Sequence, residues 1–203
     1  MIAVIDYGVG NLFSLCASLG HIGADYTVTK NTDEIEKADK IILPGVGAFG
    51  DAIQKLTESG TKETVLKCVK SGTPILGICL GMQLLFEKSF EYGEHTGLSL
   101  LKGEIAPLAP DLKSGLKVPH MGWNSLTITK ENCPILKYNK NGDFVYYVHS
   151  FYAKNCSDSL CAYSDYSIPV TGAVWKDNVF GTQFHPEKSG DTGLKMLKAF
   201  NEI

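Results

Sequence analysis

Short strand-like runs alternate with helix-forming segments through the first half of the chain, and this alternation limits the possible folds more than any other feature. Such runs are too short for buried helices and are typical of strands covered on both faces. Strands that alternate with helices predict a mostly parallel sheet with helices on both sides. The expected strands are Ile2–Asp6, Tyr26–Thr29, Lys40–Leu43 and Pro74–Ile78; the expected helices begin at Leu12, behind Asn11 as a cap, and cover Asp51–Ser59, Lys62–Lys70 and Leu80–Glu87.

After about residue 97, strand-like segments rich in β-branched and aromatic residues replace this pattern. We therefore expect an α/β fold, in which a mostly parallel central sheet flanked by helices carries an antiparallel β extension in the C-terminal half. No repeat or long linker divides the chain, which predicts a single domain over residues 1–203. The later elements should be strands Val118–Ile128, Asp143–Ala153, Val170–Trp175 and Val179–His185, and a closing helix Gly193–Phe200.

The composition excludes several classes of function. The formal net charge is −3 and no run of Lys or Arg stands out, so neither nucleic acid nor an anionic membrane is an expected partner. No segment approaches the roughly 20 apolar residues that cross a bilayer, and no secretory leader is visible, which predicts a cytoplasmic protein. None of the six cysteines has zinc-site spacing, so no metal is expected and five of them should be small buried apolar residues.

Cys79 has a different setting from the other cysteines. Gly77-Ile78-Cys79-Leu80-Gly81 lies where an expected strand passes into an expected helix, and it has the form of a nucleophile elbow with cysteine in the serine position. A residue on such a turn adopts strained backbone angles, and glycines two positions away relieve crowding around it. The nearby helix start favours a thiolate. Taken alone, the pattern also fits a buried cysteine that two glycines flank by chance.

His185 and Glu187 supply the groups that a cysteine nucleophile needs. His185-Pro186-Glu187 follows an expected strand, and ligands bind at the carboxyl ends of parallel strands. A neighbouring His helps to form the attacking thiolate, and a third group must orient its ring. Glu187 lies two residues further on, behind the rigid Pro186. A lone His is usually structural, so this interpretation depends on Cys79 and His185 meeting in the fold.

An acyl-transfer site also needs donors for the developing oxyanion. The backbone N–H of Leu80 is one candidate, and the turn Gly45-Val46-Gly47 is a second, although it also fits an ordinary tight connection. The segment that begins at Gly8 resembles a dinucleotide fingerprint, but Phe13 stands where the third glycine belongs, and no phosphate-binding loop motif occurs. No cofactor is therefore expected.

These motifs resemble those of the class I, triad-type glutamine amidotransferases. Further motifs narrow the resemblance to the glutaminase subunits of imidazole glycerol phosphate synthases, and together they span nearly the whole chain. The class motifs are Gly77 to Gln83 (GICLGMQ) and Phe184 to Glu187 (FHPE); the subfamily motifs are Asp6 to Asn11 (DYGVGN), Pro44 to Gly47 (PGVG), Pro119 to Asn124 (PHMGWN), Val148 to Tyr152 (VHSFY) and His185 to Gly190 (HPEKSG).

The resemblance implies a role for each matching residue. Cys79 would be the nucleophile, His185 the base and Glu187 its orienting partner. By themselves, Gln83 fits a solvent-facing helix residue and Glu91 an ordinary loop acid. The residues implied to bind the oxyanion are Val46, Gly47 and Leu80, and those implied to bind glutamine are Gln83, Glu91, Ser150 and Phe151.

The resemblance also implies a partner, a (β/α)8-barrel synthase subunit that receives the ammonia in a heterodimer. The implied docking residues are Tyr7, Asn11, Pro119, Met121 and Trp123, although Trp123 also fits a core position. Three alternatives stay open on the sequence. The chain could supply ammonia to a different synthase, act as a free-standing thiol hydrolase, or serve as a silent scaffold.

Overall fold

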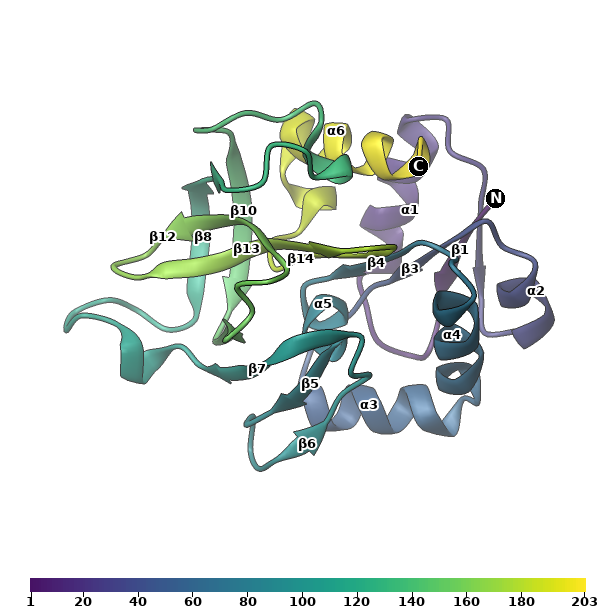
Figure 1. Ribbon diagram of the computed structural model, residues 1–203, viewed down its shortest axis with the longest axis horizontal. Helices are drawn as coiled ribbons and strands as arrows, with labels where there is room; N and C mark the ends of the chain where they lie inside the picture. Colours follow the sequence, from purple (N-terminus) through teal and green to yellow (C-terminus); the bar gives the residue numbers. More distant parts are fainter.

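An eight-stranded sheet with the order β2-β1-β3-β4-β14-β13-β12-β9 forms the centre of the molecule (Figure 1). The computed structural model describes residues 1–203. From β2 to β14 the neighbouring strands are parallel, and from β14 to β9 they are antiparallel, as the sequence predicts. The strands are β1 (Ile2–Ile5), β2 (Tyr26–Thr29), β3 (Lys40–Leu43), β4 (Ile75–Ile78), β9 (Thr127–Ile128), β12 (Leu160–Asp165), β13 (Pro169–Lys176) and β14 (Val179–Thr182).

Helices cover both faces of this sheet because its parallel strands are apolar on both sides. In β1, Ala3 and Ile5 belong to one core cluster, and Ile2 and Val4 belong to another on the opposite face. Strand side chains alternate between faces, so a continuous apolar run requires two covering layers. The first cluster lies under α2 (Thr32–Glu36), α3 (Phe49–Glu58), α4 (Thr61–Lys70) and α5 (Leu80–Leu84), and the second under α1 (Leu12–His21) and α6 (Gly190–Asn201).

The chain also forms two smaller sheets, and the expected strand segments contain both strands of the first but only one of the four in the second. One is an antiparallel ribbon of two strands, and the other has four strands in the order β11-β7-β5-β6. In Figure 1 the ribbon stands on the left, on the side away from α2 and α4. The ribbon strands are β8 (His120–Ser125) and β10 (Phe144–His149); the others are β5 (Phe86–Ser89), β6 (His95–Thr96), β7 (Leu101–Pro107) and β11 (Phe151–Lys154), and short 3-10 helices cover Ala109–Asp111, Pro134–Leu136 and Pro186–Lys188.

The expected helix over Leu80–Glu87 is wrong in its second half. The helix α5 ends at Leu84, and β5 begins at Phe86. The carbonyl of Leu84 accepts from the amide of Leu98, and the carbonyl of Leu85 accepts from the amides of Leu100 and Leu101. A segment more than ten residues away therefore provides the hydrogen bonds that end the helix, and apolar composition alone does not reveal this.

The other differences concern boundaries and short elements. Val118–Ile128 divides into β8 and β9, and Asp143–Ala153 divides into β10 and β11 around Ser150. The elements α2, β5, β6, β7 and β12 have no counterpart in the sequence analysis. Cys16 is only partly buried, so it differs from the other four cysteines that are correctly expected in the interior. No helix has the length and apolar character needed to cross a membrane.

Candidate active site

Cys79 occupies a strained turn between β4 and α5. Its φ is 54° and its ψ is −110°, which are rare values for a residue other than glycine. Its amide donates to the carbonyl of Thr182 at the end of β14 (2.7 Å), and its carbonyl accepts from the amide of Gln83 (3.1 Å). The neighbouring strand and the following helix thus hold the backbone on both sides of the thiol. This geometry is that of the predicted elbow.

The two glycines that flank Cys79 are required for a different reason from the one expected. A Cβ on Gly77 would lie 2.7 Å from the backbone of Gly81, and a Cβ on Gly81 would overlap the carbonyl oxygen of Leu43. The crowding is therefore between the backbones of β3, β4 and α5, and not around the thiol itself. The glycines allow these three elements to approach closely enough to form the turn.

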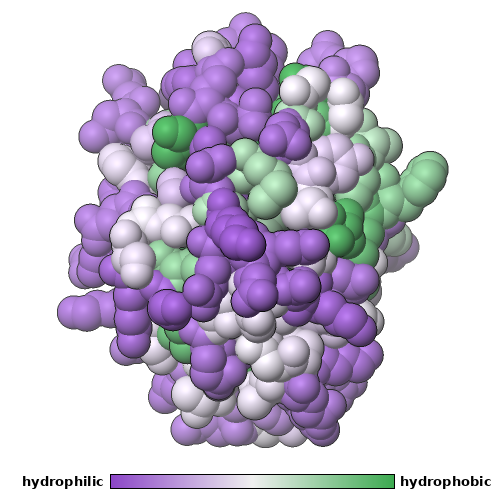
Figure 2. Space-filling model, turned by 90° about the vertical axis from the view of Figure 1, so that its right-hand side faces the viewer, coloured by the Kyte–Doolittle hydropathy of each residue, from purple (hydrophilic) through white to green (hydrophobic).

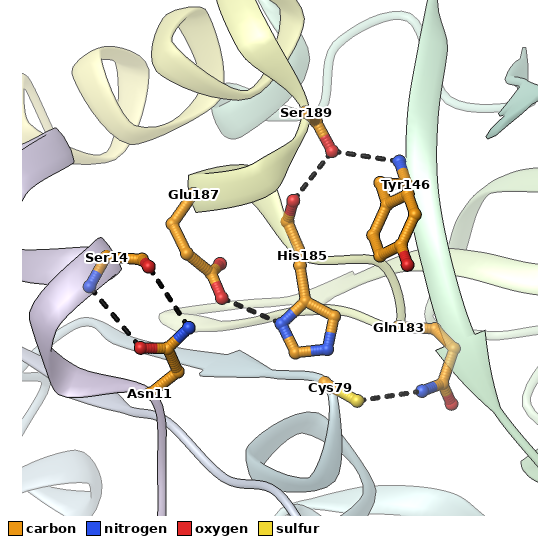
Figure 3. Close-up of polar contacts among 8 residues, drawn as sticks. All are labelled: Asn11, Ser14, Cys79, Tyr146, Gln183, His185, Glu187 and Ser189. Carbon is orange, nitrogen blue, oxygen red and sulfur yellow. Dashed lines mark hydrogen bonds and ion pairs between the residues drawn. The ribbon is translucent and has the colours of Figure 1, made fainter. Parts of the chain in front are cut away.

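His185 lies beside Cys79 although the two are far apart in the sequence (Figure 3). The amide of His185 donates to the carbonyl of Tyr146 (3.0 Å), and Ser189 Oγ donates to the carbonyl of His185 (2.6 Å). Its ring Nδ1 is 2.7 Å from Glu187 Oε1, and both side chains are almost fully buried. A carboxylate can only accept, so Nδ1 carries a hydrogen. The Nε2 atom has no partner and is free for the reaction.

The environment of His185 favours its charged form. Burial by itself lowers the pKa of the imidazole, but the neighbouring Cys79, together with the hydrogen bond and charge of Glu187, outweighs burial and raises the pKa to about 10. An opposite charge in a buried site stabilises the ionised ring more strongly than it would in water. The resting site is therefore suited to an imidazolium beside Cys79.

A cavity of about 450 Å³ opens at the thiol, and its walls include both Cys79 and His185. The backbone amides of Val46, Gly47 and Ser150 have no hydrogen-bond partner within the chain. They are donors available to a ligand in this cavity. Pro119, Val148 and His149 line the same cavity. So do all the residues predicted to bind the oxyanion or glutamine, which are Val46, Gly47, Leu80, Gln83, Glu91, Ser150 and Phe151.

Gln83 and Glu91 are buried and already bonded, so neither is a solvent-facing residue. Gln83 Nε2 donates to the carbonyl of Phe151 (3.1 Å) and to Gln183 Oε1 (3.0 Å), which leaves only its own oxygen for a ligand. Glu91 Oε2 accepts from the amide of Phe49 at the start of α3 (2.6 Å). Burial raises the pKa of the Glu91 carboxyl, although this bond opposes the shift.

Among the residues expected at a docking surface, Tyr7 does not fit. It is 4% exposed, packs in the core, and donates its hydroxyl to the carbonyl of Pro44 (2.7 Å). Asn11 is partly buried and caps α1 by accepting from the amide of Ser14. Pro119 is exposed, as are Met121 (65%) and Trp123 (53%), so Trp123 is not a core residue.

Gln183 also belongs to the site, although it is not among the residues predicted from the sequence. This residue is fully buried, contacts Gln83, and lies with Nε2 3.7 Å from Cys79 Sγ (Figure 3). A signal was present, because Gln183 is a polar residue inside the apolar run that precedes His185. Buried amides are hydrogen-bonded, so such a position calls for a partner.

Known proteins are similar to this chain in sequence. The family model "Glutamine amidotransferase class-I" matches residues 3–202. The imidazole glycerol phosphate synthase subunit HisH of Caldanaerobacter subterraneus is 52% identical over all of this chain and 98% of its own length. HisH of Wolinella succinogenes is 49% identical over the whole of both chains.

Solved structures with low sequence identity share the fold. A crystal structure of a glutamine amidotransferase superposes with a TM-score of 0.77 at 17% identity over both complete chains. The PurLQS structure from Thermotoga maritima gives 0.72 at 20% identity, over 98% of this chain and 96% of that one. The matches to the family model and to the HisH relatives show that the chain belongs to the class I glutamine amidotransferases and, within them, to the HisH subunits of imidazole glycerol phosphate synthase.

Proposed function

We propose that this chain hydrolyses glutamine to glutamate and ammonia through Cys79, His185 and Glu187, and passes the ammonia to a synthase subunit. The observation that carries this proposal is the meeting of the strained Cys79 turn with the buried His185–Glu187 pair at one cavity. Its volume of about 450 Å³ is within the usual range for small-molecule sites. The membership in the HisH family supports the same reaction.

In the first half of the reaction, the Cys79 thiolate attacks the carboxamide carbon of glutamine. A C–S bond forms, and the carbonyl electron pair moves to oxygen, which would accept hydrogen bonds from the backbone amides of Val46, Gly47 and Leu80. His185 then gives its Nε2 proton to the departing nitrogen, the C–N bond breaks, and ammonia leaves. Glu187 holds the ring through Nδ1 and stabilises its charged form.

In the second half, water hydrolyses the thioester. His185, now neutral, takes a proton from the water as the water oxygen bonds to the carbonyl carbon. The C–S bond then breaks, its electron pair returns to sulfur, and glutamate is released. No cofactor or metal takes part in either half.

The head group of glutamine also needs partners in the cavity. The Glu91 carboxylate and the Gln83 oxygen are acceptors suited to the α-ammonium group. The free amide of Ser150, with the backbone of Phe151, is a donor site suited to the α-carboxylate. These roles are consistent with the burial of the Gln83 and Glu91 side chains.

The β8–β10 ribbon is the best candidate for the docking surface. Its inner residues, such as Val145 and Tyr147, are buried, yet its outer face carries the exposed side chains of Met121, Trp123 and Phe144. An antiparallel ribbon that is apolar on both faces favours protein association. By contrast, the side at the right of Figure 1 is largely hydrophilic, apart from an apolar patch along one edge (Figure 2).

The ribbon also adjoins the cavity, since Pro119 and Val148 line its wall. A partner seated on the ribbon would therefore cover the exit and receive ammonia before it reaches solvent. The name of the relatives supports imidazole glycerol phosphate synthase as the assembly. We propose that it works in the cytoplasm and that the partner in the heterodimer is a (β/α)8-barrel synthase subunit, as the sequence motifs imply.

The test of the reaction separates its two nitrogen sources. Cys79→Ala in the complex should abolish the glutamine-dependent synthase reaction, and the reaction supplied with ammonium salts should continue at the unaltered rate. Cys16→Ala, which changes a cysteine away from the cavity, is the matched control. Retained glutamine use in the Cys79→Ala complex would reject the proposed nucleophile, and absence of synthase activity with the barrel subunit would favour another acceptor enzyme.

The test of docking measures affinity for the barrel subunit. Trp123→Ala should weaken binding by about 2 kcal/mol, or roughly thirtyfold in Kd, as expected for an exposed aromatic anchor. Val28→Ala, an exposed apolar residue on the edge strand β2, should leave the affinity unchanged. Equal affinities for the two variants would exclude the ribbon as the docking site.

A further inference from the structure

Gln183 lies against the reactive sulfur and has no role in the reaction as described above. It follows β14, is fully buried, and directs its side chain between Gln83 and Cys79. Figure 3 shows its nitrogen pointing at the sulfur, opposite the side on which Glu187 holds the ring of His185. A buried side-chain amide forms hydrogen bonds with both its NH₂ group and its oxygen, so the partners of these atoms indicate the role of the residue.

The orientation of Gln183 follows by elimination from one carbonyl group. The carbonyl oxygen of Phe151 can only accept, and Gln83 Nε2 lies 3.1 Å from it, so the nitrogen end of Gln83 must face Phe151. The same nitrogen has a second hydrogen, which it donates to Gln183 across 3.0 Å. Gln183 therefore presents its oxygen to Gln83, and only its nitrogen remains to face Cys79.

This nitrogen is 3.7 Å from Cys79 Sγ, a distance at which an N–H donates to sulfur. A donor aimed at sulfur stabilises the charged thiolate more than the neutral thiol, because hydrogen bonds to ionised groups are the stronger ones. We propose that Gln183 is a positioning residue that stabilises the Cys79 thiolate, and that Gln83 acts through it by holding the amide nitrogen toward the sulfur.

The inference rests on the proposed function, in which the thiolate attacks glutamine. The contact would act twice in that reaction. It would stabilise the thiolate before attack, and it would meet the sulfur again when the thioester C–S bond breaks and the electron pair returns to sulfur. Gln83 would then contribute to the nucleophile as well as to the glutamine head group.

The experiment measures the rate at which iodoacetamide alkylates Cys79 as a function of pH, in the full chain. Mass spectrometry of the peptide that carries Cys79 separates it from the other five cysteines. Gln183→Met removes the donor at similar length, and the pH of half-maximal alkylation should rise by about one unit. Gln183→Glu should raise it further, because a carboxylate opposes the thiolate. Gln54→Met, at an exposed position on α3, should reproduce the unaltered profile.

A merely structural role predicts a different result. In that case Gln183→Met would lower the thermal stability without moving the alkylation profile, and this outcome would overturn the inference. Gln83→Met, which leaves Gln183 in place but unheld, should give a smaller shift in the same direction.

A measurement on the unaltered chain covers the case in which these variants do not fold. The side-chain NH₂ resonance of Gln183 should shift when Cys79 is alkylated, and a resonance that does not move would also overturn the inference. None of these readouts needs glutamine turnover. Failure of the proposed function, seen as glutamine use by Cys79→Ala, is therefore recognised separately.

Discussion

Replacing Gly81 with alanine should disturb both the stability of the chain and the reactivity of its thiol. The new Cβ would overlap the carbonyl oxygen of Leu43 at the end of β3, and the next nearest atoms are also backbone. A flexible side chain could turn away, but the backbone of a central strand cannot. Either α5 or β3 must therefore move, and Cys79 is the residue that joins β4 to α5.

The expected size of the effect follows from this overlap. Inserting a methyl group into a tightly packed site costs about 1–3 kcal/mol, and the better helix propensity of alanine returns less than about 1 kcal/mol. For a chain of this length, each 1 kcal/mol corresponds to about 2–4 °C in Tm. A displacement of the thiol by about 1 Å should also slow the reaction by roughly a hundredfold.

The chain contains a matched control in Gly20, near the end of α1. A Cβ there would meet no atom within 4 Å, so Gly20→Ala should stabilise the chain by about 0.5–1 kcal/mol. Thermal unfolding and the rate of Cys79 alkylation should be measured for both variants. If Gly81→Ala unfolds and reacts like the unaltered chain, the close approach of β3 and α5 is not what requires glycine here.

Three further predictions concern ionisable groups of the site. Cys79→Ala should lower the pKa of His185 from about 10, because burial stays while the contribution of Cys79 is lost. The ring should then lose its proton at a lower pH than in the unaltered chain, which histidine NMR titration can follow, and an unchanged pKa would contradict the pairing of Cys79 with His185. Glu187→Gln should lower kcat by about 10²–10⁴ with little change in KM, since only the orientation and charge of the ring are affected, and a change confined to KM would contradict this role. Glu91→Ala should raise KM for glutamine, and it should destabilise the chain by about 1 kcal/mol in urea unfolding because it removes the acceptor of the first amide of α3. Replacing the exposed Glu94 with alanine should have neither effect, and equal behaviour of the two variants would argue against both roles of Glu91.

The parallel half of the fold could be predicted because its signals are local. The runs at Ile2 and Lys40 are apolar on both faces, so both their strand conformation and their burial follow from the residues themselves. Local signals also identify the two reactive residues, because glycines flank Cys79 and an expected strand ends just before His185. The parallel order then brings these strand ends to one edge of the sheet.

Other features depend on segments that are distant in the sequence, and the prediction failed or was incomplete there. The apolar stretch after Leu80 looks helical throughout, but α5 stops at Leu84 because the segment at Leu98–Leu101 takes its last carbonyls. Tyr7 seemed suited to a surface, yet its hydroxyl bonds the carbonyl of Pro44 and its ring enters the core.

The sequence by itself determined the class of fold and the chemical groups of the site, since periodicity, glycine spacing and residue type are properties of short segments. Only the tertiary structure decided how these groups face one another: that Nε2 of His185 is left free, that Gln83 and Gln183 form a directed pair, and that Trp123 is exposed. The physical reason is that hydrogen-bond direction and burial are set by partners from other strands and helices, and a single segment contains no information about which partner it will meet.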